Sequence, residues 1–249
     1  MYDNHSPILS RAKFKRVLSA LLLGLAILAG LYLTDAKVKQ PQEAQPTLQG
    51  RQVETTNPSL GSYKNALEGL GALPVKGRAP KTGYTRSQFG EGWQAIDTCD
   101  TRNKILARDM TEVIFKPSTC VVVSGILQDP YTAKSIVFNR GAQSSSLVQI
   151  DHIVALSDAW QKGAQLLSPS LRIELANDPL ELLAVDGPAN QQKGDGDAAT
   201  WLPSNKNFRC SYVSRQISVK IKYSLWITSA EKDAMLAILK NCPNTPLST

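Results

Sequence analysis

A chain of 249 residues is long enough to form one or two domains with buried cores. It contains 28 Lys and Arg against 21 Asp and Glu, so its formal net charge is +7, which suits a polyanionic partner such as nucleic acid. Any basic exported protein shares such a charge, so charge alone does not identify the partner. Four cysteines without CxxC spacing and only two histidines argue against a zinc site.

The first 36 residues combine a basic flank with an apolar segment. Residues 17–33 are seventeen uncharged, mostly aliphatic residues, and they follow four basic residues within positions 11–16. This segment is just long enough to cross a bilayer and is long for the apolar part of a signal peptide, which favours an uncleaved anchor. The alternative is a signal peptide cleaved after Ala36. Both interpretations place the rest of the chain outside the cytoplasm, either secreted or anchored to the outer face of the membrane.

Residues 37–60 contain few large apolar side chains and show no periodicity, so we expect a disordered linker. Removing residues 1–36 leaves 24 basic and 19 acidic side chains, a net charge of +5. All four cysteines follow the apolar segment, and an even number in an exported chain predicts disulfides. Three pairings are possible. The local pairings, Cys99–Cys120 and Cys210–Cys242, are favoured.

The first part of the predicted domain contains short helices and strands. Helical spacing of apolar residues predicts a helix from Tyr63 to Leu73 and a helical run through Ile105, Leu106 and Met110. Short apolar runs separated by turn residues predict strands at Val113–Phe115, Val121–Val123 and Ile136–Phe138.

Two arginines in this part are candidate phosphate contacts. Arg86 and Arg102 have side chains suited to bind a phosphate group. Ion pairs with Asp97 or Asp100, which would hold this part of the chain together, are an equally good interpretation.

The stretch 147–197 contains the predicted strands and helix that carry the candidate catalytic residues. A charged Asp151–His152 pair lies inside an apolar, β-branched run, which predicts a strand. A second strand follows at Leu182–Val185, then a turn at Asp186–Pro188 and a short polar helix that begins near Asn190. Two strands, a tight turn and a helix form a frame that directs one His, one Asp and one Asn toward a single point.

Helices are predicted on either side of this frame. Between the two strands, Leu156–Ala164 and Pro169–Ala176 have apolar faces typical of core packing. Further on, a helix is expected from about Tyr212 to Ser224, and a capping box starting at Thr228 begins a helix that ends near Asn241. Three basic residues in this region suit either a solvated helix face or contacts with a DNA backbone: Arg209, Arg215 and Lys220.

Histidine is scarce, which limits the candidates for a general base. The chain has only His5, in the N-terminal tail, and His152. Any imidazole base of the folded part is therefore His152. The competing interpretation is a half-buried structural Asp–His pair, which is the more common role of such a pair.

The neighbouring oxygen ligands suggest a magnesium site. The Asp151 carboxylate and the Asn190 amide oxygen are too few for an all-protein cage, but they suit Mg²⁺, which keeps several waters and binds substrate phosphate; Mn²⁺ is a possible substitute. His152 would deprotonate a water for in-line attack on phosphorus. Lys193, one helical turn after Asn190, would neutralise a neighbouring phosphate.

These motifs resemble a known nuclease superfamily. Asp151-His152-Ile153-Val154, the strand Leu182–Val185 and the Asn-x-x-Lys-Gly-Asp pattern starting at Asn190 are similar to the HNH, or ββα-metal, endonucleases. The resemblance is strongest to exported single-domain members that share the nuclease domain of GmrSD-type restriction enzymes. Flanking motifs extend it over roughly residues 63–242. It implies an α+β fold with a ββα-metal core (147–197), added helices and short strands and two disulfides, within a nuclease domain at 61–249.

The resemblance also implies roles for individual residues, with one departure. It assigns His152 as general base and Asp151 and Asn190 as metal ligands. The family usually has an Asn at the start of the second strand to orient the imidazole, and here that position is Glu181. A glutamate can accept a hydrogen bond from the ring. Its negative charge would, however, raise the pKa of His152 and favour the charged imidazolium, which cannot accept a proton. Asn177 is an alternative orienting residue.

The expected function is an exported, Mg²⁺-dependent endonuclease that cleaves DNA with little sequence specificity; the sequence leaves open whether RNA is also a substrate. The departure at Glu181 supports an alternative, an HNH-like module that binds nucleic acid at the cell surface with weakened catalysis. A hydrolase of cell-wall or lipid phosphodiesters is a third interpretation. No feature predicts an obligate protein partner, and the membrane is a partner only if the N-terminal segment stays uncleaved.

Overall fold

The computed structural model describes residues 60–141 and 145–249, all within one compact unit, Glu54–Thr249. The predicted N-terminal anchor or signal peptide and nearly all of the predicted linker lie outside the described residues. Among those described, no helix has the length and apolarity needed to span a bilayer.

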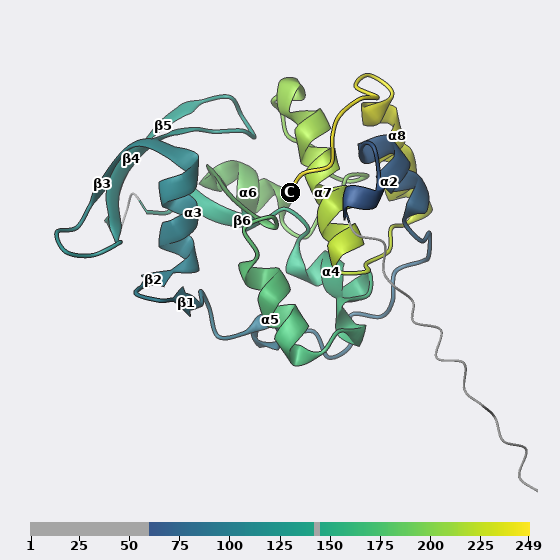
Figure 1. The fold of residues 1–249 in the computed structure, drawn as a ribbon, viewed down its shortest axis with the longest axis horizontal. Coiled ribbons are helices and arrows are strands. Elements are labelled where there is room, and N and C mark those ends of the chain that lie inside the picture. Colours follow the sequence, from purple (N-terminus) through teal and green to yellow (C-terminus); the bar gives the residue numbers. More distant parts are fainter. Residues whose placement is uncertain (1–59, 142–144) are drawn as a thin grey trace, which may run out of the picture. The chain divides into compact units, whose positions relative to one another are not determined.

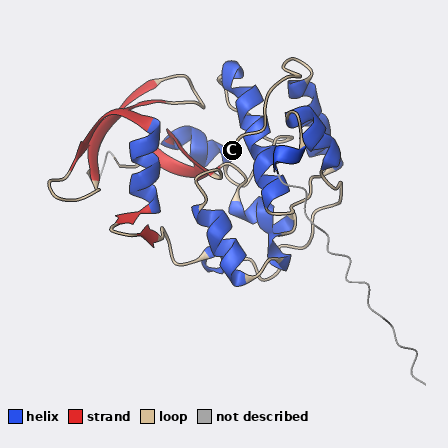
Figure 2. Cartoon of the chain, viewed as in Figure 1, coloured by secondary structure: helices blue, strands red, loops and turns tan. Residues whose placement is uncertain are grey.

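The described residues form an α+β fold of seven α-helices and three small antiparallel sheets, as expected (Figures 1 and 2). The helices are α2 (Ala66–Ala72), α3 (Thr101–Asp109), α4 (Leu156–Gln161), α5 (Pro169–Asn177), α6 (Gly187–Lys193), α7 (Arg209–Lys222) and α8 (Ser229–Leu239). The strands are β1 (Ala95–Ile96), β2 (Cys99–Asp100), β3 (Met110–Phe115), β4 (Val122–Gln128), β5 (Ser135–Asn139), β6 (Val148–His152) and β7 (Leu182–Asp186). Short 3₁₀ turns complete the fold: η1 (Leu60–Ser62), η2 (Arg86–Phe89), η3 (Ala164–Leu166) and η4 (Lys206–Phe208).

Strands β6 and β7 pair antiparallel, and α6 follows β7 directly, so the predicted strand–strand–helix frame is present. The register places His152 opposite Leu182 and Val148 opposite Asp186. Between the two strands the chain makes the excursion that contains α4, η3 and α5. Figure 1 shows this unit between the β3–β4–β5 sheet on one side and helices α2, α7 and α8 on the other.

Both faces of the β6–β7 pair are buried. Side chains alternate across a strand, so neighbouring residues of β7 pack into different cores. Leu183 and Val185 belong to a core built mainly from the helices, whereas Leu182 and Ala184 belong to a second core. The second core also contains residues of α3 and of the β3–β5 sheet. The end of β6, which carries Asp151 and His152, is therefore fixed between two packed cores.

The turn from β7 into α6 depends on a glycine and two aspartates. A Cβ on Gly187 would lie 2.0 Å from the carbonyl oxygen of Ser146, so no larger residue fits there. The side chain of Asp186 accepts a hydrogen bond from the Ala189 amide and caps α6. Asp129, in the turn between β4 and β5, accepts from the Asp186 amide at 2.8 Å. These contacts fix the start of the helix that carries Asn190.

The expected elements are present with shifted boundaries. The helical run expected through Met110 ends at Asp109, because Met110 is extended and pairs with Leu127 as the first residue of β3. The expected helix Leu156–Ala164 ends at Gln161, and Gly163, with φ of +122°, separates it from η3. The Thr228 cap is confirmed, because its side chain accepts from the Glu231 amide.

Both predicted disulfides are confirmed. Cys99–Cys120 joins β2 to the turn between β3 and β4, and Cys210–Cys242 joins the start of α7 to the segment after α8.

We expect replacement of both Cys210 and Cys242 by serine to lower the free energy of unfolding by about 3 kcal/mol, because the unfolded chain gains freedom across the closed loop. Urea denaturation of the oxidised proteins measures the difference. A loss below about 1 kcal/mol would contradict the expected contribution of the disulfide.

Candidate active site

A cavity of about 400 Å³ opens beside the end of β6. It brings together five of the side chains singled out from the sequence, and they come from β6, α6, η2 and α3: Asp151, His152, Asn190, Arg86 and Arg102. Glu181, Lys193, Arg209, Arg215 and Lys220 do not line it.

The His152 ring is held by a backbone carbonyl and an aromatic side chain. Its Nε2 lies 3.0 Å from the carbonyl oxygen of Ala176, at the end of α5. A carbonyl only accepts hydrogen bonds, so Nε2 carries the proton and Nδ1 is the basic nitrogen of the neutral ring. Trp93 stacks on the imidazole, with ring centroids 5.7 Å apart and planes within 8°. These contacts hold the ring in one orientation and one tautomer.

The ring is neutral over the physiological pH range. Burial lowers the pKa of His152 to about 3; the hydrogen bond to Ala176 opposes this shift, and the positive charges of Arg86 and Lys193 add to it. His152 therefore needs no deprotonation before it accepts a proton from water.

This lowered pKa predicts a pH-dependent stability. Between pH 6.5 and about pH 3 the unfolded histidine binds a proton that the folded one does not. The contribution of His152 therefore lowers the free energy of unfolding by up to about 1.4 kcal/mol for each pH unit below 6.5. Urea denaturation of the wild type and His152→Asn in EDTA at pH 7, 6 and 5 should show a steeper fall for the wild type. The comparison between them removes the contributions of other groups, and parallel curves would contradict the prediction.

The expected orienting role of Glu181 is wrong. Its side chain is completely buried, and both carboxyl oxygens lie 3.2 Å from the amide nitrogen of Val154. Burial raises the pKa of Glu181 well above its ordinary value, and its carboxyl is bonded to the Val154 amide and not to the His152 ring. Asn177 accepts from the Gln94 amide and is not bonded to the ring. The Ala176 carbonyl orients the His152 ring instead. Because it is a backbone atom, no residue type in the sequence indicates this role.

Asp151 is held from two sides. Both of its carboxylate oxygens lie 2.9 Å from Nζ of Lys193, and the hydroxyl of Tyr131 donates to Oδ2. Lys193 also donates to the carbonyl of His152 at 2.7 Å and is almost completely buried. Lys193 is therefore a buried partner of Asp151, and its predicted contact with a substrate phosphate is wrong. Sequence reasoning missed Tyr131, whose only signal is its position in a turn-forming motif after Asp129-Pro130.

Asn190 lies on α6, and its amide is oriented by Gln149. Its Nδ2 donates to Gln149 Oε1 at 2.9 Å, so its carbonyl oxygen is the atom that can meet a cation. Asp151 and Asn190 thus offer one carboxylate and one amide oxygen to the same cavity. In residues 60–141 and 145–249, no group of three or more His, Cys, Asp or Glu side chains is arranged to hold a metal. This donor set fits a hydrated Mg²⁺ or Mn²⁺ and does not fit a fully caged ion.

The cavity wall also carries positive charge. Arg86 is exposed, and Arg102 is half-buried with Nη2 donating to the carbonyl of Val148 at 3.2 Å. Burial, and then the nearby charge of Arg140, lower the pKa of Arg102, although a guanidinium remains charged. Two guanidinium groups beside Asp151 and His152 are suited to bind phosphate oxygens.

Three other predicted nucleic-acid contacts lie outside this cavity, and each is bonded to other parts of the protein. Arg215 donates to the backbone carbonyls of Pro179, Leu180 and Leu182, and so holds the segment that leads into β7. Arg209 donates to the carbonyl of Pro203.

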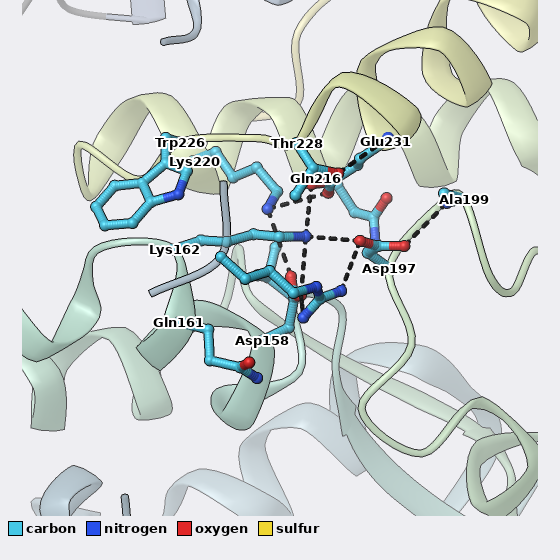
Figure 3. A network of polar contacts seen from close by, with 12 residues as sticks. Asp158, Gln161, Lys162, Asp197, Ala199, Gln216, Lys220, Trp226, Thr228 and Glu231 are labelled. Carbon is cyan, nitrogen blue, oxygen red and sulfur yellow. Dashed lines mark hydrogen bonds and ion pairs between the residues drawn. The ribbon is translucent and has the colours of Figure 1, made fainter. Parts of the chain in front are cut away.

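Lys220 is completely buried, so a DNA contact at this residue is wrong. Its Nζ lies 3.0 Å from Glu231 and 3.6 Å from Asp158. Figure 3 shows the ion network to which it belongs, with Lys162 near the centre. Lys162 Nζ lies 2.8 Å from Asp158, 2.8 Å from Asp197 and 2.6 Å from Glu231.

Arg78 completes the network through contacts with Asp158 at 2.8 Å and Asp197 at 2.7 Å. Three cations thus balance three carboxylates. The network joins α4, α7 and α8 to the loop after α6, which also carries Asp195 on the cavity wall.

The sequence is similar to nuclease-related proteins. The family described as "GmrSD restriction endonucleases, C-terminal domain" matches residues 100–238. A protein of Arthroderma benhamiae, named "Uncharacterized secreted protein", is 36% identical over 189 residues, which cover 75% of this chain and 89% of that protein. No solved structure matches the chain significantly. This chain belongs to the family of GmrSD restriction endonuclease C-terminal domains.

Proposed function

We propose that this chain is an exported, metal-dependent endonuclease that hydrolyses phosphodiester bonds in DNA, with RNA as the alternative substrate, and has little sequence specificity. The observation that carries the proposal is the cavity beside β6. There a neutral imidazole of fixed tautomer meets two hard oxygen ligands and two guanidinium groups. The restriction-endonuclease family to which the chain belongs supports the same chemistry.

Each side chain has a defined task in the proposed mechanism. Arg86 and Arg102 bind oxygens of the substrate backbone and hold the scissile phosphate in the cavity. His152 Nδ1 accepts a proton from the water that attacks phosphorus, while Ala176 and Trp93 keep the ring in place. Asp151 and Asn190 would hold the divalent cation, which when bound stabilises charge on the phosphoryl and leaving oxygens.

Lys193 and Tyr131 act on Asp151 and do not touch the substrate. Their hydrogen bonds fix the carboxylate, and the ammonium of Lys193 balances its buried charge. Because the charge of Asp151 is already balanced by Lys193, this carboxylate would bind a divalent cation only weakly. Weak binding suits an ion that keeps most of its waters.

Export is supported by two disulfides, by the apolar N-terminal segment of the sequence and by the secreted relative. The alternative, a module that binds nucleic acid without cleaving it, was motivated by Glu181. Because the Ala176 carbonyl orients His152, Glu181 no longer favours that alternative.

Digestion of supercoiled plasmid DNA by the oxidised full chain tests the proposal. We expect nicking and then linearisation in Mg²⁺ or Mn²⁺, and no cleavage in EDTA. Cleavage that persists in EDTA would contradict the role of the cation. Intact plasmid together with intact single-stranded DNA in both metals, with the disulfides formed, would contradict the nuclease itself.

A further inference from the structure

A second cavity, of about 150 Å³, adjoins the first at His152. The two share His152, Arg86, Trp93 and Leu156 in their walls. The second cavity also reaches Ala176, whose carbonyl binds Nε2 of the ring, whereas the first reaches Asp151 and Asn190. His152 therefore stands between the proposed phosphate site and a neighbouring space to which the mechanism assigns no role.

The second cavity combines aromatic and apolar side chains with the polar groups of Arg86 and His152. Phe89, Trp93 and Leu156 form much of its wall, together with the backbone of Gly90 and Gly92. These glycines have φ of +98° and +93°, a conformation that residues with a side chain rarely adopt. The loop thus passes the cavity without a side chain to fill it.

Size and charge limit what this cavity can hold. A cavity of about 150 Å³ accommodates one benzene-sized ring. None of the described residues that line it is acidic, and Arg86 lies at the boundary with the phosphate site. The best fit is a flat ring joined to an anionic group. A nucleobase attached to the phosphate of its own nucleotide has this chemistry.

We propose that this second cavity holds the base of a nucleotide next to the cleaved bond, so that the preferred substrate is unpaired nucleic acid. This inference rests on the proposed nuclease function. A base in a duplex is stacked and paired, and it must leave the helix to enter a cavity beside its phosphate, whereas an unpaired base is free to enter. Trp93 offers an aromatic surface that the base can contact.

The test compares three forms of one end-labelled DNA strand, digested by the oxidised full chain in Mg²⁺. The first is single-stranded, the second is annealed to its complement, and the third is single-stranded with a central tract of abasic residues. We expect the single strand to be cleaved at least roughly 10-fold faster than the duplex, and the abasic tract to be spared while its flanks are cut. The tract keeps its phosphates, so only the missing bases account for protection.

Trp93→Ala should bring the single-strand and duplex rates close together, whatever it does to the absolute rate. Phe115→Ala is the matched control, because Phe115 is an exposed aromatic residue on β3 that lines neither cavity. We expect it to keep the wild-type ratio.

Binding in EDTA separates failure of this inference from failure of the nuclease proposal. We expect the wild type to bind the intact single strand roughly 5-fold to 100-fold more tightly than a fully abasic strand of the same length, and Trp93→Ala to bind both alike. Equal binding by the wild type, or cleavage of duplex and abasic tract as fast as the single strand, would overturn the base site. Preferential binding of intact single strands without cleavage in any metal would support the base site and contradict only the nuclease proposal.

Discussion

His152→Ala should lower kcat/KM for DNA cleavage by about 10²-fold to 10⁴-fold, the usual contribution of a general base. No other histidine lies in the described residues, and the only other one in the chain is His5. Binding of DNA should remain salt-sensitive and nearly unchanged, because Arg86 and Arg102 remain in the cavity wall. Initial rates of plasmid nicking and anisotropy of labelled DNA in EDTA measure the two effects separately.

His5→Ala is the matched control and should cleave DNA at the wild-type rate. Unchanged turnover in His152→Ala would contradict the assigned base. Loss of both turnover and binding, together with a lowered free energy of unfolding, would instead indicate that the ring is structural.

Lys162→Ala should lower the free energy of unfolding by about 3–5 kcal/mol, the usual result of breaking a buried ion pair. The substitution removes one of three cations from the buried network and leaves Asp158, Asp197 and Glu231 short of positive charge (Figure 3). Urea denaturation at pH 7 measures the change.

Lys81→Ala is the control for this prediction. Lys81 pairs with Asp195 at 3.1 Å, but both side chains are more than half exposed. Removing such a pair should cost less than about 1 kcal/mol. Equal effects of the two substitutions would contradict the importance assigned to the buried network.

The central frame could be predicted from the sequence because its signals are local. An apolar run around Asp151 and His152, a second apolar run and a Gly-Pro turn predict two strands and a helix, which the structure contains. The resemblance to nucleases then assigned Asp151, His152 and Asn190 to one site, and the structure brings all three to one cavity. The disulfides followed from the local pairing of four cysteines.

The basic residues were harder to predict, because the sequence does not show which side chains are buried. Lys193 and Lys220 have the same charge as Arg86, yet both are buried and paired with carboxylates on other helices or strands. Lys220 meets Glu231 across two packed helices, and Lys193 meets Asp151 across the α6–β6 contact. Long-range contacts of this kind arise only when the chain is folded.

The role of Glu181 was unpredictable for a related reason. A glutamate at this position suggested a charged partner for His152. Its completely buried carboxyl instead accepts from the Val154 amide, and a backbone carbonyl on α5 binds the ring. The role of Tyr131 could not be predicted, because a tyrosine in a turn gives no sign of the carboxylate to which it will donate.

Cleavage of DNA in ¹⁸O-labelled water, with mass spectrometry of the products, examines the proposed chemistry at the reacting bond. If His152 activates a water for attack on phosphorus, each new terminal phosphate should contain one solvent oxygen, and product should form only with a divalent cation present. Product phosphates without solvent oxygen, or labelled product formed equally fast by His152→Ala, would contradict the mechanism.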